Sequence, residues 1–428
     1  MLPFEGSIFY YMSAHLPNSQ YPRIVIIGAG FGGLSAAIKL GEKKKEVLII
    51  DKMNHHLFQP LLYQVATAGL SPSDIATPVR EILKKYSSIT VAMEEVSQIN
   101  KEESSIRTKT NRYLEFNNLI VATGARHSYF GNDEWEKIAP GLKSLEDALT
   151  IRENILRSFE LSEMESDPDK VEALTTFVVI GAGPTGVEMA GSIAEIAKKT
   201  LAKNFTQIDP RNSKIYLIEG GDRVLSSFHS SLSQKAKEDL EKLGVIVKLN
   251  SMVKEINDDG VQVEDDFIHA KNIIWAAGNK ASPLLEKLNT NLDRMGRVLV
   301  ENDCSIKGHS NIFVLGDAAA FKTSDGFLPG LAPVASQQGK YVAKLITKKL
   351  DKGKRDPFEY LDKGSMATIG KSKAIMEVGK MRFTGLFAWM CWCFVHLLFL
   401  VLFRNKVAIL SSWIYNYFTE KRGARLIK

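Results

Sequence analysis

The chain has 428 residues, enough for two or three domains that each bury a full hydrophobic core. With 45% hydrophobic and 24% charged residues, its composition is that of a folded globular protein and excludes a largely disordered chain. The net charge of +6 arises without a long basic tract, so nothing indicates nucleic acid as a partner. A mild basic excess also suits an anionic cofactor or an anionic lipid surface.

The amino terminus and the cysteines exclude two further classes. Residues 1–22 lack the basic start and long apolar core of a secretory signal. Met12 is an alternative start, and the first eleven residues read as a disordered extension. The three cysteines, Cys304, Cys391 and Cys393, rule out a disulfide scaffold and a Cys-x-x-Cys metal knuckle. We therefore expect no metal site.

The first element is a strand, glycine-rich turn, helix and strand over residues 24–51. The turn reads GAGFGG, in which Gly28 permits a tight turn, Gly30 lets a pyrophosphate approach the backbone, and Gly33 lets the helix pack on the strand. The helix amino terminus offers free N–H groups to phosphates, and Asp51 can accept hydrogen bonds from ribose hydroxyls. This unit predicts a dinucleotide site that also includes Phe31, Gly32 and Lys52.

A second unit of the same kind follows about 150 residues later, over residues 177–219. Its turn reads GAGPTGVE and supplies Gly181, Gly183, Pro184, Thr185 and Gly186. Glu219 ends the next strand, where an acid pairs with the ribose 2′-OH and repels a 2′-phosphate, so the site favours NADH over NADPH. Glu188, just inside the helix, lies on the nicotinamide side or is simply a favourable acid near a helix amino terminus.

Three other apolar strands each run into glycine, at residues 119–124, 273–278 and 312–317. Glycine at a strand end lets a ligand approach closely, so these ends are added to the cofactor site. The residues concerned are Ala122, Thr123, Gly124, Ala277, Gly278, Gly316 and Asp317. Polar stretches between the strands, such as residues 160–170 and 257–266, read as surface loop or hairpin.

Two dinucleotide sites in one chain require a chemical reason. A nicotinamide carries hydride, and a flavin accepts hydride and releases electrons singly or in pairs, so we expect FAD at the first site and NADH at the second. The stretch LGDAAAF supports this, because Asp317 can bind a ribityl chain and a helix directly after it would point its amino terminus at the flavin. The alternative is a simple helix cap at Asp317.

The carboxyl-terminal segment is almost wholly apolar. Residues 386–403 contain no formal charge, and eighteen helical residues span about 27 Å, which is marginal for a bilayer core of about 30 Å. Tryptophans and flanking basic residues favour a pair of membrane-embedded or interfacial helices, with residues 407–418 as the amphipathic companion. A full span and a buried dimer helix are the alternatives. His396 is expected to be a packing residue.

Together these features resemble the two-dinucleotide-binding-domain flavoproteins, and in particular the type II NADH:quinone oxidoreductases, which are single-chain respiratory NADH dehydrogenases. Six stretches spanning nearly the whole chain carry the resemblance: IVIIGAGFGGLSAA, NHHLFQPLLYQVATAGL, VVIGAGPTGVEMAG, NIFVLGDAAAF, LPGLAPVASQQGKYVAKLI and DKGSMATIG. The second and fifth are the more specific ones.

The resemblance implies further site residues. The segment around residues 328–346 borders the flavin and the quinone in the family, where the usual pattern is Ala-Gln-x-Ala-x-Gln. This chain has Pro333 in place of the first glutamine and keeps the second as Gln337, with Val334, Ala335 and Gln338 beside them. Lys363 and Gln59 fall in stretches that approach the flavin in relatives. Glu188, Gln337 and Lys363 are the residues predicted to act in the reaction.

The expected fold is α/β, with two Rossmann-like domains and carboxyl-terminal membrane-associating helices. The expected boundaries are residues 22–145 and 291–355 for the FAD domain, 146–290 for an inserted NADH domain, and 356–428 for the membrane-associated region. The expected reaction passes electrons from NADH through FAD to ubiquinone or menaquinone without proton pumping, at a lipid bilayer surface. In a bacterium this would be the cytoplasmic face of the inner membrane; a homodimer is an open alternative.

The cysteine positions and the apolar tail argue against several other functions. Sulfide:quinone oxidoreductases and flavin disulfide reductases need a redox-active cysteine pair beside the flavin, but no cysteine precedes Cys304. A ferredoxin-type reductase leaves the apolar tail unexplained. A membrane-docked flavoprotein with a regulatory role would show slow turnover and a long-lived reduced flavin.

Overall fold

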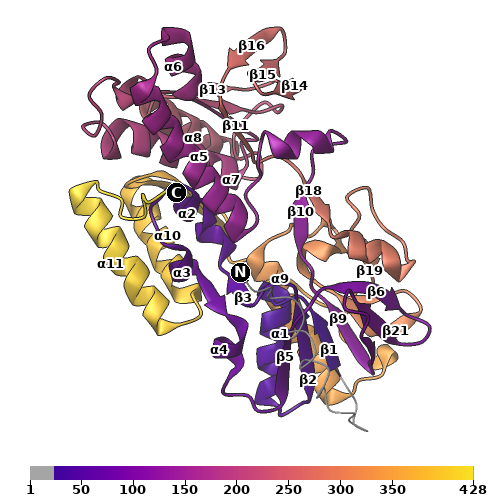
Figure 1. Cartoon of the computed structure of the whole chain (residues 1–428). Coiled ribbons are helices and arrows are strands. Elements are labelled where there is room, and N and C mark those ends of the chain that lie inside the picture. The colour runs from indigo at the N-terminus through magenta and orange to yellow at the C-terminus, as the bar shows by residue number, and fades with distance from the viewer. Residues whose placement is uncertain (1–23, 428) are drawn as a thin grey trace, which may run out of the picture. The chain divides into compact units, whose positions relative to one another are not determined.

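The structure, a computed structural model, describes residues 24–427, so the predictions about Met12 and the residues before it lie outside the described part. The chain divides into two compact units (Figure 1). Unit 1 comprises the residues up to 53, 83–124 and 283–358, and unit 2 comprises 54–82, 125–282 and 359 onward. Segment 54–82 packs with unit 2, although the sequence places it beside the first nucleotide site. The predicted domain boundaries stay predictions.

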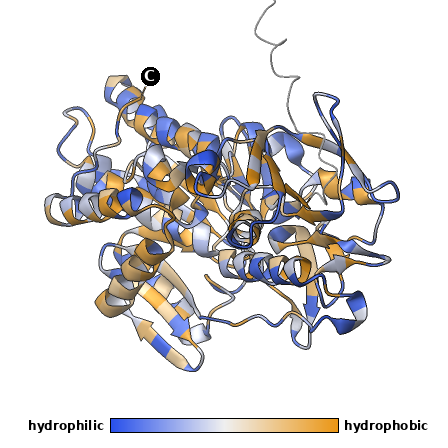
Figure 2. Cartoon of the chain, turned by 90° about the horizontal axis from the view of Figure 1, so that it is seen from below, coloured by the Kyte–Doolittle hydropathy of each residue, from blue (hydrophilic) through white to orange (hydrophobic). Residues whose placement is uncertain are grey.

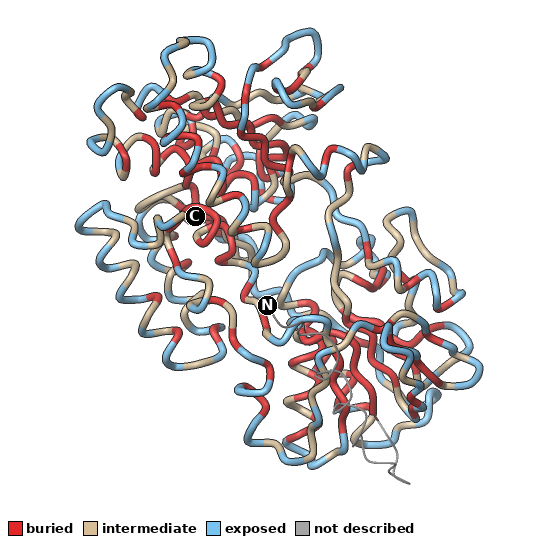
Figure 3. Tube along the Cα trace, in the orientation of Figure 1, coloured by how far each residue is buried: buried red, intermediate tan, exposed pale blue. Residues whose placement is uncertain are grey.

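Unit 1 is built on a nine-stranded sheet in the order β23-β22-β19-β20-β21-β9-β1-β2-β5. Its centre is parallel, with Ile24 paired to both Val47 and Asn118, and its β-branched strands are buried on both faces (Figure 3). The strands are β1 (Ile24–Ile27), β2 (Val47–Asp51), β5 (Ile89–Met93), β9 (Asn118–Val121), β19 (Val298–Val300), β20 (Ser305–Ile306), β21 (His309–Val314), β22 (Ala319–Thr323) and β23 (Gly326–Phe327).

Two helices of unit 1 come unusually close. They are α1 (Phe31–Glu42) and α9 (Ala332–Lys348). A Cβ placed on Gly339 would lie 2.2 Å from the carbonyl oxygen of Gly32, so glycine is required where the helices meet. A small antiparallel sheet completes the unit, formed by β6 (Val96–Asn100), β7 (Ser105–Thr108) and β8 (Tyr113–Glu115), with short 3₁₀ turns at Pro283–Leu288, Gly316–Ala318 and Lys352–Lys354.

Unit 2 repeats the parallel plan in a four-stranded sheet, β13-β12-β11-β17. Its strands and helices are β11 (Thr176–Ile180), α7 (Pro184–Glu195), β12 (Lys214–Ile218), α8 (Ser230–Lys242), β13 (Val245–Lys248), β17 (Asn272–Trp275), α5 (Leu145–Met164) and α6 (Pro168–Leu174). An antiparallel sheet of β14 (Val253–Asn257), β15 (Gly260–Val263) and β16 (Asp266–His269) occupies the stretch predicted as hairpin. The mixed α/β fold predicted from the sequence is confirmed.

Shorter elements of unit 2 link these layers. They are β3 (His55–Leu57), a 3₁₀ turn at Gln59–Leu61, α2 (Leu62–Ala66), α3 (Pro72–Ile75), β4 (Ala76–Pro78), α4 (Val79–Leu83), β10 (Ala125–His127), a 3₁₀ turn at Asp133–Lys137, a π-helical turn at Ile196–Thr200, a 3₁₀ turn at Pro210–Asn212 and β18 (Asn279–Ala281).

Two local predictions are wrong. Residues 160–170 are not a loop, because α5 continues to Met164 and α6 begins at Pro168. No helix follows Asp317 directly: residues 319–323 form β22, which pairs with β19 in the register Val298↔Ala319, and the next helix starts at Ala332. In both cases pairing or packing with distant residues decides the local structure.

The carboxyl-terminal region forms an antiparallel sheet and two helices. They are β24 (Ser365–Gly370), β25 (Lys373–Val378), β26 (Met381–Thr384), α10 (Gly385–Phe399) and α11 (Phe403–Thr419), and their hydropathy can be followed in Figure 2. None of the helices between residues 24 and 427 combines the length and apolar character that crossing a membrane requires.

Candidate functional site

The first glycine turn, between β1 and α1, has the geometry of a phosphate cradle. Gly28 has a φ of +99°, and a Cβ there would lie 2.3 Å from the carbonyl oxygen of Ala122 at the end of β9. A Cβ on Gly33 would lie 1.9 Å from the carbonyl oxygen of Gly28. Gly30, in contrast, has no described heavy atom within 4 Å of its Cβ position. Gly28 and Gly33 are thus needed for folding, whereas Gly30 leaves open space beside the backbone.

Asp51 ties the two strands of this cradle together. Its Oδ2 accepts a hydrogen bond from the Ala29 N–H at 2.6 Å, and its Oδ1 accepts one from the Met53 N–H at 2.7 Å. The carboxylate therefore lies beside the glycine turn with lone pairs left for a ribose hydroxyl.

The second turn, between β11 and α7, has the same arrangement of glycines as the first. Gly181 also has a φ of +99°, and its Cβ would lie 2.8 Å from the Ala277 nitrogen at the end of β17. A Cβ on Gly186 would lie 1.8 Å from the carbonyl oxygen of Gly181, whereas Gly183 has no described neighbour within 4 Å. Glu219 accepts from the Ala182 N–H at 2.7 Å and from the Gly221 N–H at 2.8 Å.

Other predicted residues of unit 1 gather at the first cradle. Ala335 lies against both Gly32 and Gly316: a Cβ on Gly32 would lie 3.3 Å from its oxygen, and one on Gly316 would lie 2.9 Å from its Cβ. The Thr123 hydroxyl, which follows β9, is buried with no hydrogen-bond partner in the described chain. An open pyrophosphate approach, an acid at the ribose position and an unpaired buried hydroxyl fit a dinucleotide such as FAD.

The remaining predicted residues of the flavin and quinone side lie on α9 and around the first cradle. Gln337 and Pro333 are half-buried on α9, next to the buried Val334, while Lys52 and Phe31 flank the cradle. Gln338 is 1% exposed and accepts a hydrogen bond from the Gly316 N–H at 2.7 Å, so its amide holds the backbone. These roles at a cofactor stay predictions.

Two predicted residues belong to unit 2 at separate places. The exposed Gln59 donates from Nε2 to the carbonyl oxygen of Lys143 at 3.0 Å. The Lys363 Nζ lies 5.9 Å over the ring of Phe399. Neither contact tests the predicted approach to a flavin.

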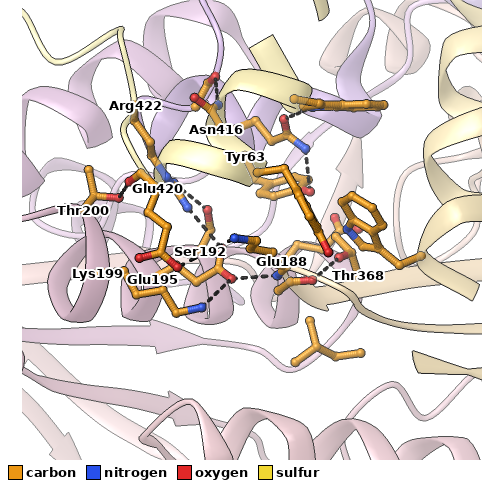
Figure 4. A pocket seen from close by; sticks show the side chains of 18 of the residues that line it. Tyr63, Glu188, Ser192, Glu195, Lys199, Thr200, Thr368, Asn416, Glu420 and Arg422 are labelled. Carbon is orange, nitrogen blue, oxygen red and sulfur yellow. Dashed lines mark hydrogen bonds and ion pairs between the residues drawn. The ribbon is translucent and has the colours of Figure 1, made fainter. Parts of the chain in front are cut away.

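Unit 2 contains a pocket that the sequence did not predict (Figure 4). It is a hollow open to solvent, between α2, α7 and β24 on one side and the helices α10 and α11 on the other. Three tryptophans form its aromatic wall, Trp389, Trp392 and Trp413, and the rings of the last two lie 5.4 Å apart. The Trp392 side chain is buried, and its Nε1–H has no hydrogen-bond partner within the described residues.

The opposite wall of this pocket carries two titratable groups. Burial raises the pKa of Glu188 to about 8, against the opposing effect of a hydrogen bond from the Thr368 N–H. Burial, followed by the nearby charge of Glu188, also raises the pKa of Tyr63 well above its usual value. Both groups therefore hold their protons near neutral pH, so the wall presents neutral O–H groups to a ligand.

His396 packs behind the tryptophan wall. Its ring stacks on Trp392 at 4.1 Å, and its Nδ1 lies 2.7 Å from the Trp392 carbonyl oxygen. Burial lowers the pKa of His396 to about 4, so the ring is neutral. This agrees with the packing role expected from the sequence.

Comparison with known proteins places this architecture in a family. A model described as pyridine nucleotide-disulphide oxidoreductase matches residues 22–339, and one described as NDH2 C-terminal domain matches residues 363–421. The chain is 41% identical over 425 residues to the type II NADH:quinone oxidoreductase Ndh of Mycobacterium tuberculosis, covering 95% of this chain and 91% of the relative. The chain belongs to the type II NADH:quinone oxidoreductases.

Other relatives agree with this assignment. A second M. tuberculosis protein, type II NADH:quinone oxidoreductase NdhA, is 42% identical, with 95% of this chain and 89% of that protein covered. The structure of NDH2 from Plasmodium falciparum in complex with NADH matches with a TM-score of 0.87 at 20% identity, over 95% of this chain and 100% of that one. The predicted enzyme class is confirmed, and the ferredoxin-type and regulatory alternatives are not favoured.

The sulfide:quinone oxidoreductase of Aquifex aeolicus shares the fold alone, at a TM-score of 0.73 and 17% identity, with 93% of this chain and 95% of that one covered. Among the described residues of this chain, Cys304 is buried, and Cys391 and Cys393 lie on α10.

Proposed function

We propose that this enzyme binds FAD at the Gly28 cradle and NADH at the Gly181 cradle, and reduces a quinone whose headgroup enters the tryptophan-lined pocket. The observation that carries the two-nucleotide assignment is the duplicated cradle, in which each glycine turn has one open glycine and one acid bonded to its backbone. FAD, when bound, accepts a hydride and passes on two electrons.

The chain's own part in NADH binding is selection and positioning. The amino terminus of α7 offers N–H groups to the pyrophosphate, and Gly183 leaves the space for it. The Glu219 carboxylate, fixed by two backbone N–H groups, can accept from the ribose 2′-OH and repels a 2′-phosphate. This supports NADH over NADPH.

The pocket has the donors that a quinone headgroup needs. Its aromatic wall suits a flat ring, and quinone oxygens accept hydrogen bonds. The unpaired Trp392 Nε1–H and the neutral Glu188 carboxyl are two such donors. A carboxyl whose pKa is near 8 can give a proton to a reduced quinone oxygen and regain one from water. Gln337 and Lys363 remain proposed contacts on the flavin side.

The helices α10 and α11 support docking on a lipid bilayer surface. The outward stripe of α11 is apolar and exposed, formed by Phe403, Val407, Leu410, Ile414 and Phe418. Its inward side is held by polar contacts instead: Asn405 donates to the Thr77 hydroxyl at 3.0 Å and Trp413 to Gln64 at 2.7 Å. A helix anchored inward by polar groups with apolar residues outward suits an apolar surrounding.

Charge distribution supports the same surface. Residues 379–428 contain eight lysine and arginine residues and one acid, Glu420, so this segment carries a net charge of +7, against +6 for the whole chain. Such segregation favours an anionic membrane face. In a bacterium this would be the cytoplasmic face of the inner membrane, with no proton pumping, and a homodimer remains an alternative to test.

Trp392→Phe tests the pocket, because it keeps a ring and removes only the unpaired N–H. We expect the KM for a soluble quinone to rise by roughly three- to tenfold, the effect of one lost hydrogen bond of about 1 kcal/mol. Flavin reduction by NADH should be unchanged. Trp389→Phe, in the same wall, is the matched control. An unchanged quinone KM in Trp392→Phe would contradict the pocket assignment.

A further inference from the structure

One arginine beyond the last helix, Arg422, reaches back to line the pocket beside α7. Arg422 lies three residues after α11, and its side chain is only 12% exposed. Its NH1 donates to the Ser192 hydroxyl at 3.0 Å and its NH2 donates to the Glu195 carboxylate at 3.3 Å (Figure 4). Its NH1 also donates to the Thr67 carbonyl oxygen at 2.7 Å. Thr67 ends α2, and the other two residues lie on α7.

The three acceptors are themselves connected. The Thr67 and Ser192 hydroxyls lie 2.8 Å apart in a buried contact between α2 and α7. Glu195 also accepts the Lys371 N–H at 2.7 Å from the turn after β24 and pairs with Lys199 at 3.8 Å. The Arg422 guanidinium therefore connects the carboxyl-terminal tail with α2 and α7. The turn between β24 and β25 contacts the same place through Glu195.

The joined helices carry the proposed quinone wall. Glu188 precedes Ser192 by four residues on α7, so the two share one helix face. Tyr63 lies on α2 four residues before Thr67, whose hydroxyl donates to the Tyr63 carbonyl oxygen at 2.8 Å. Gln64 donates to the Tyr63 hydroxyl at 2.9 Å and accepts from Trp413 on α11 at 2.7 Å. A shift of α2 against α7 would change the spacing of Tyr63, Glu188 and Trp413.

A guanidinium suits this position better than an ammonium. Its planar fork can meet a carbonyl, a hydroxyl and a carboxylate in fixed directions, whereas a lysine presents one point charge. Burying a charged group is costly unless it is paired and hydrogen-bonded, and Arg422 is paired with the Glu195 carboxylate and bonded to the two other acceptors described above.

We infer that Arg422 is a positioning residue for quinone reduction: it locks α2 to α7 and so fixes the distance between the Tyr63 and Glu188 sides of the pocket. This rests on the proposed quinone pocket and deepens it. Arg422 contacts α7 at Ser192 and Glu195, in the carboxyl-terminal half of the helix, whereas the NADH cradle lies at its amino terminus. NADH binding and quinone binding should therefore respond differently to the removal of Arg422.

The test compares Arg422→Ala, Arg422→Lys and the control Arg425→Ala, whose Nε donates to the Arg422 carbonyl oxygen. Full-length variants would be assayed for flavin reduction by NADH and for steady-state quinone kinetics across pH. In Arg422→Ala we expect a quinone KM roughly tenfold higher, equal to about 1.4 kcal/mol. The NADH-dependent rate should stay within about twofold, Arg422→Lys should fall between, and Arg425→Ala should match wild type.

A pH profile separates positioning from a general loss of structure. Glu188 should respond to a looser pocket, so the pH at which quinone turnover falls should move downward in Arg422→Ala as burial decreases. If Arg422→Ala does not fold, Ser192→Ala removes one acceptor without removing the charge and should raise the quinone KM in the same direction. An unchanged KM and pH profile in the folded variants would overturn the inference.

The result is separable from the proposed function. If Trp392→Phe raises the quinone KM but the Arg422 and Ser192 variants do not, only this inference fails. If Trp392→Phe and the Arg422 variants all leave the quinone KM unchanged, the pocket itself is wrong.

Discussion

Two alanine substitutions in the second cradle separate folding from nucleotide binding. Gly183 has a φ of −70° and a ψ of −178°, which alanine adopts freely, and its Cβ position has no described neighbour within 4 Å. The Cβ position of Gly186 lies 1.8 Å from the backbone oxygen of Gly181. The methyl group of Gly183→Ala would occupy the space proposed for the pyrophosphate. The methyl group of Gly186→Ala would instead clash with the protein backbone.

The expected magnitudes differ accordingly. Gly183→Ala should change the free energy of unfolding by no more than about 0.5 kcal/mol, as a substitution without clashes does. It should raise the NADH concentration needed for flavin reduction roughly 100-fold, or about 2.7 kcal/mol, because the methyl blocks the close backbone approach. Gly186→Ala should cost about 1–3 kcal/mol of stability, since a backbone contact must open.

The assay pairs thermal unfolding with anaerobic mixing of enzyme and NADH, read by flavin absorbance. Gly183→Ala should unfold like wild type and need far more NADH. Gly186→Ala should unfold at a temperature lower by several degrees, at about 2–4 °C for each kcal/mol. A Gly183→Ala enzyme that reacts at wild-type NADH concentrations would refute the cradle assignment, and an undiminished Gly186→Ala stability would refute the packing argument.

Three further predictions concern charge and surface. Glu219→Gln should raise the ratio of NADPH to NADH kcat/KM by roughly tenfold, and an unchanged ratio would contradict the ribose assignment. Because the pKa of Glu188 is about 8 in the folded chain and 4.5 in the reference state, the native chain keeps a proton that the unfolded chain loses. The free energy of unfolding of the wild type should therefore fall relative to that of Glu188→Gln as pH rises from 4.5 to 8, by up to about 1.4 kcal/mol per pH unit. Urea unfolding of both proteins at pH 5 and pH 8 measures this difference. If the stabilities of the two proteins changed with pH in parallel, the prediction would be wrong. The double variant Phe403→Glu, Val407→Glu should no longer sediment with anionic vesicles, while it still turns over a soluble quinone. If the variant still sedimented with the vesicles, α11 would not be part of the docking surface.

The nucleotide cradles could be predicted from sequence because their geometry is local. The order of Gly28, Gly30 and Gly33 after a β-branched strand leaves few ways to connect strand and helix, and Gly181 to Gly186 repeat it. Backbone sterics alone assign most of these positions. The acid of each cradle, Asp51 or Glu219, could also be predicted, because it stands at the end of the next parallel strand.

The pocket could not be predicted in the same way. Its walls come from Tyr63, Glu188, Thr368, Trp392 and Arg422, which are separated by up to several hundred positions. From the sequence, the tryptophans are predicted to lie at a membrane interface, because their neighbours are apolar. The sequence does not show the direction in which each indole N–H points. The strand after Asp317 was missed because it forms by pairing with β19, in the register Val298↔Ala319, and not from a local signal in its own residues.

The most direct test of the whole account is anaerobic double mixing of the purified flavoprotein, first with NADH and then with quinone, followed by flavin absorbance. NADH should bleach the flavin, NADPH should do so far more slowly, and quinone should restore the oxidised spectrum within one turnover. A protein that carries no flavin, or whose NADH-reduced flavin is not reoxidised by quinone, would contradict electron transfer from NADH through FAD to quinone.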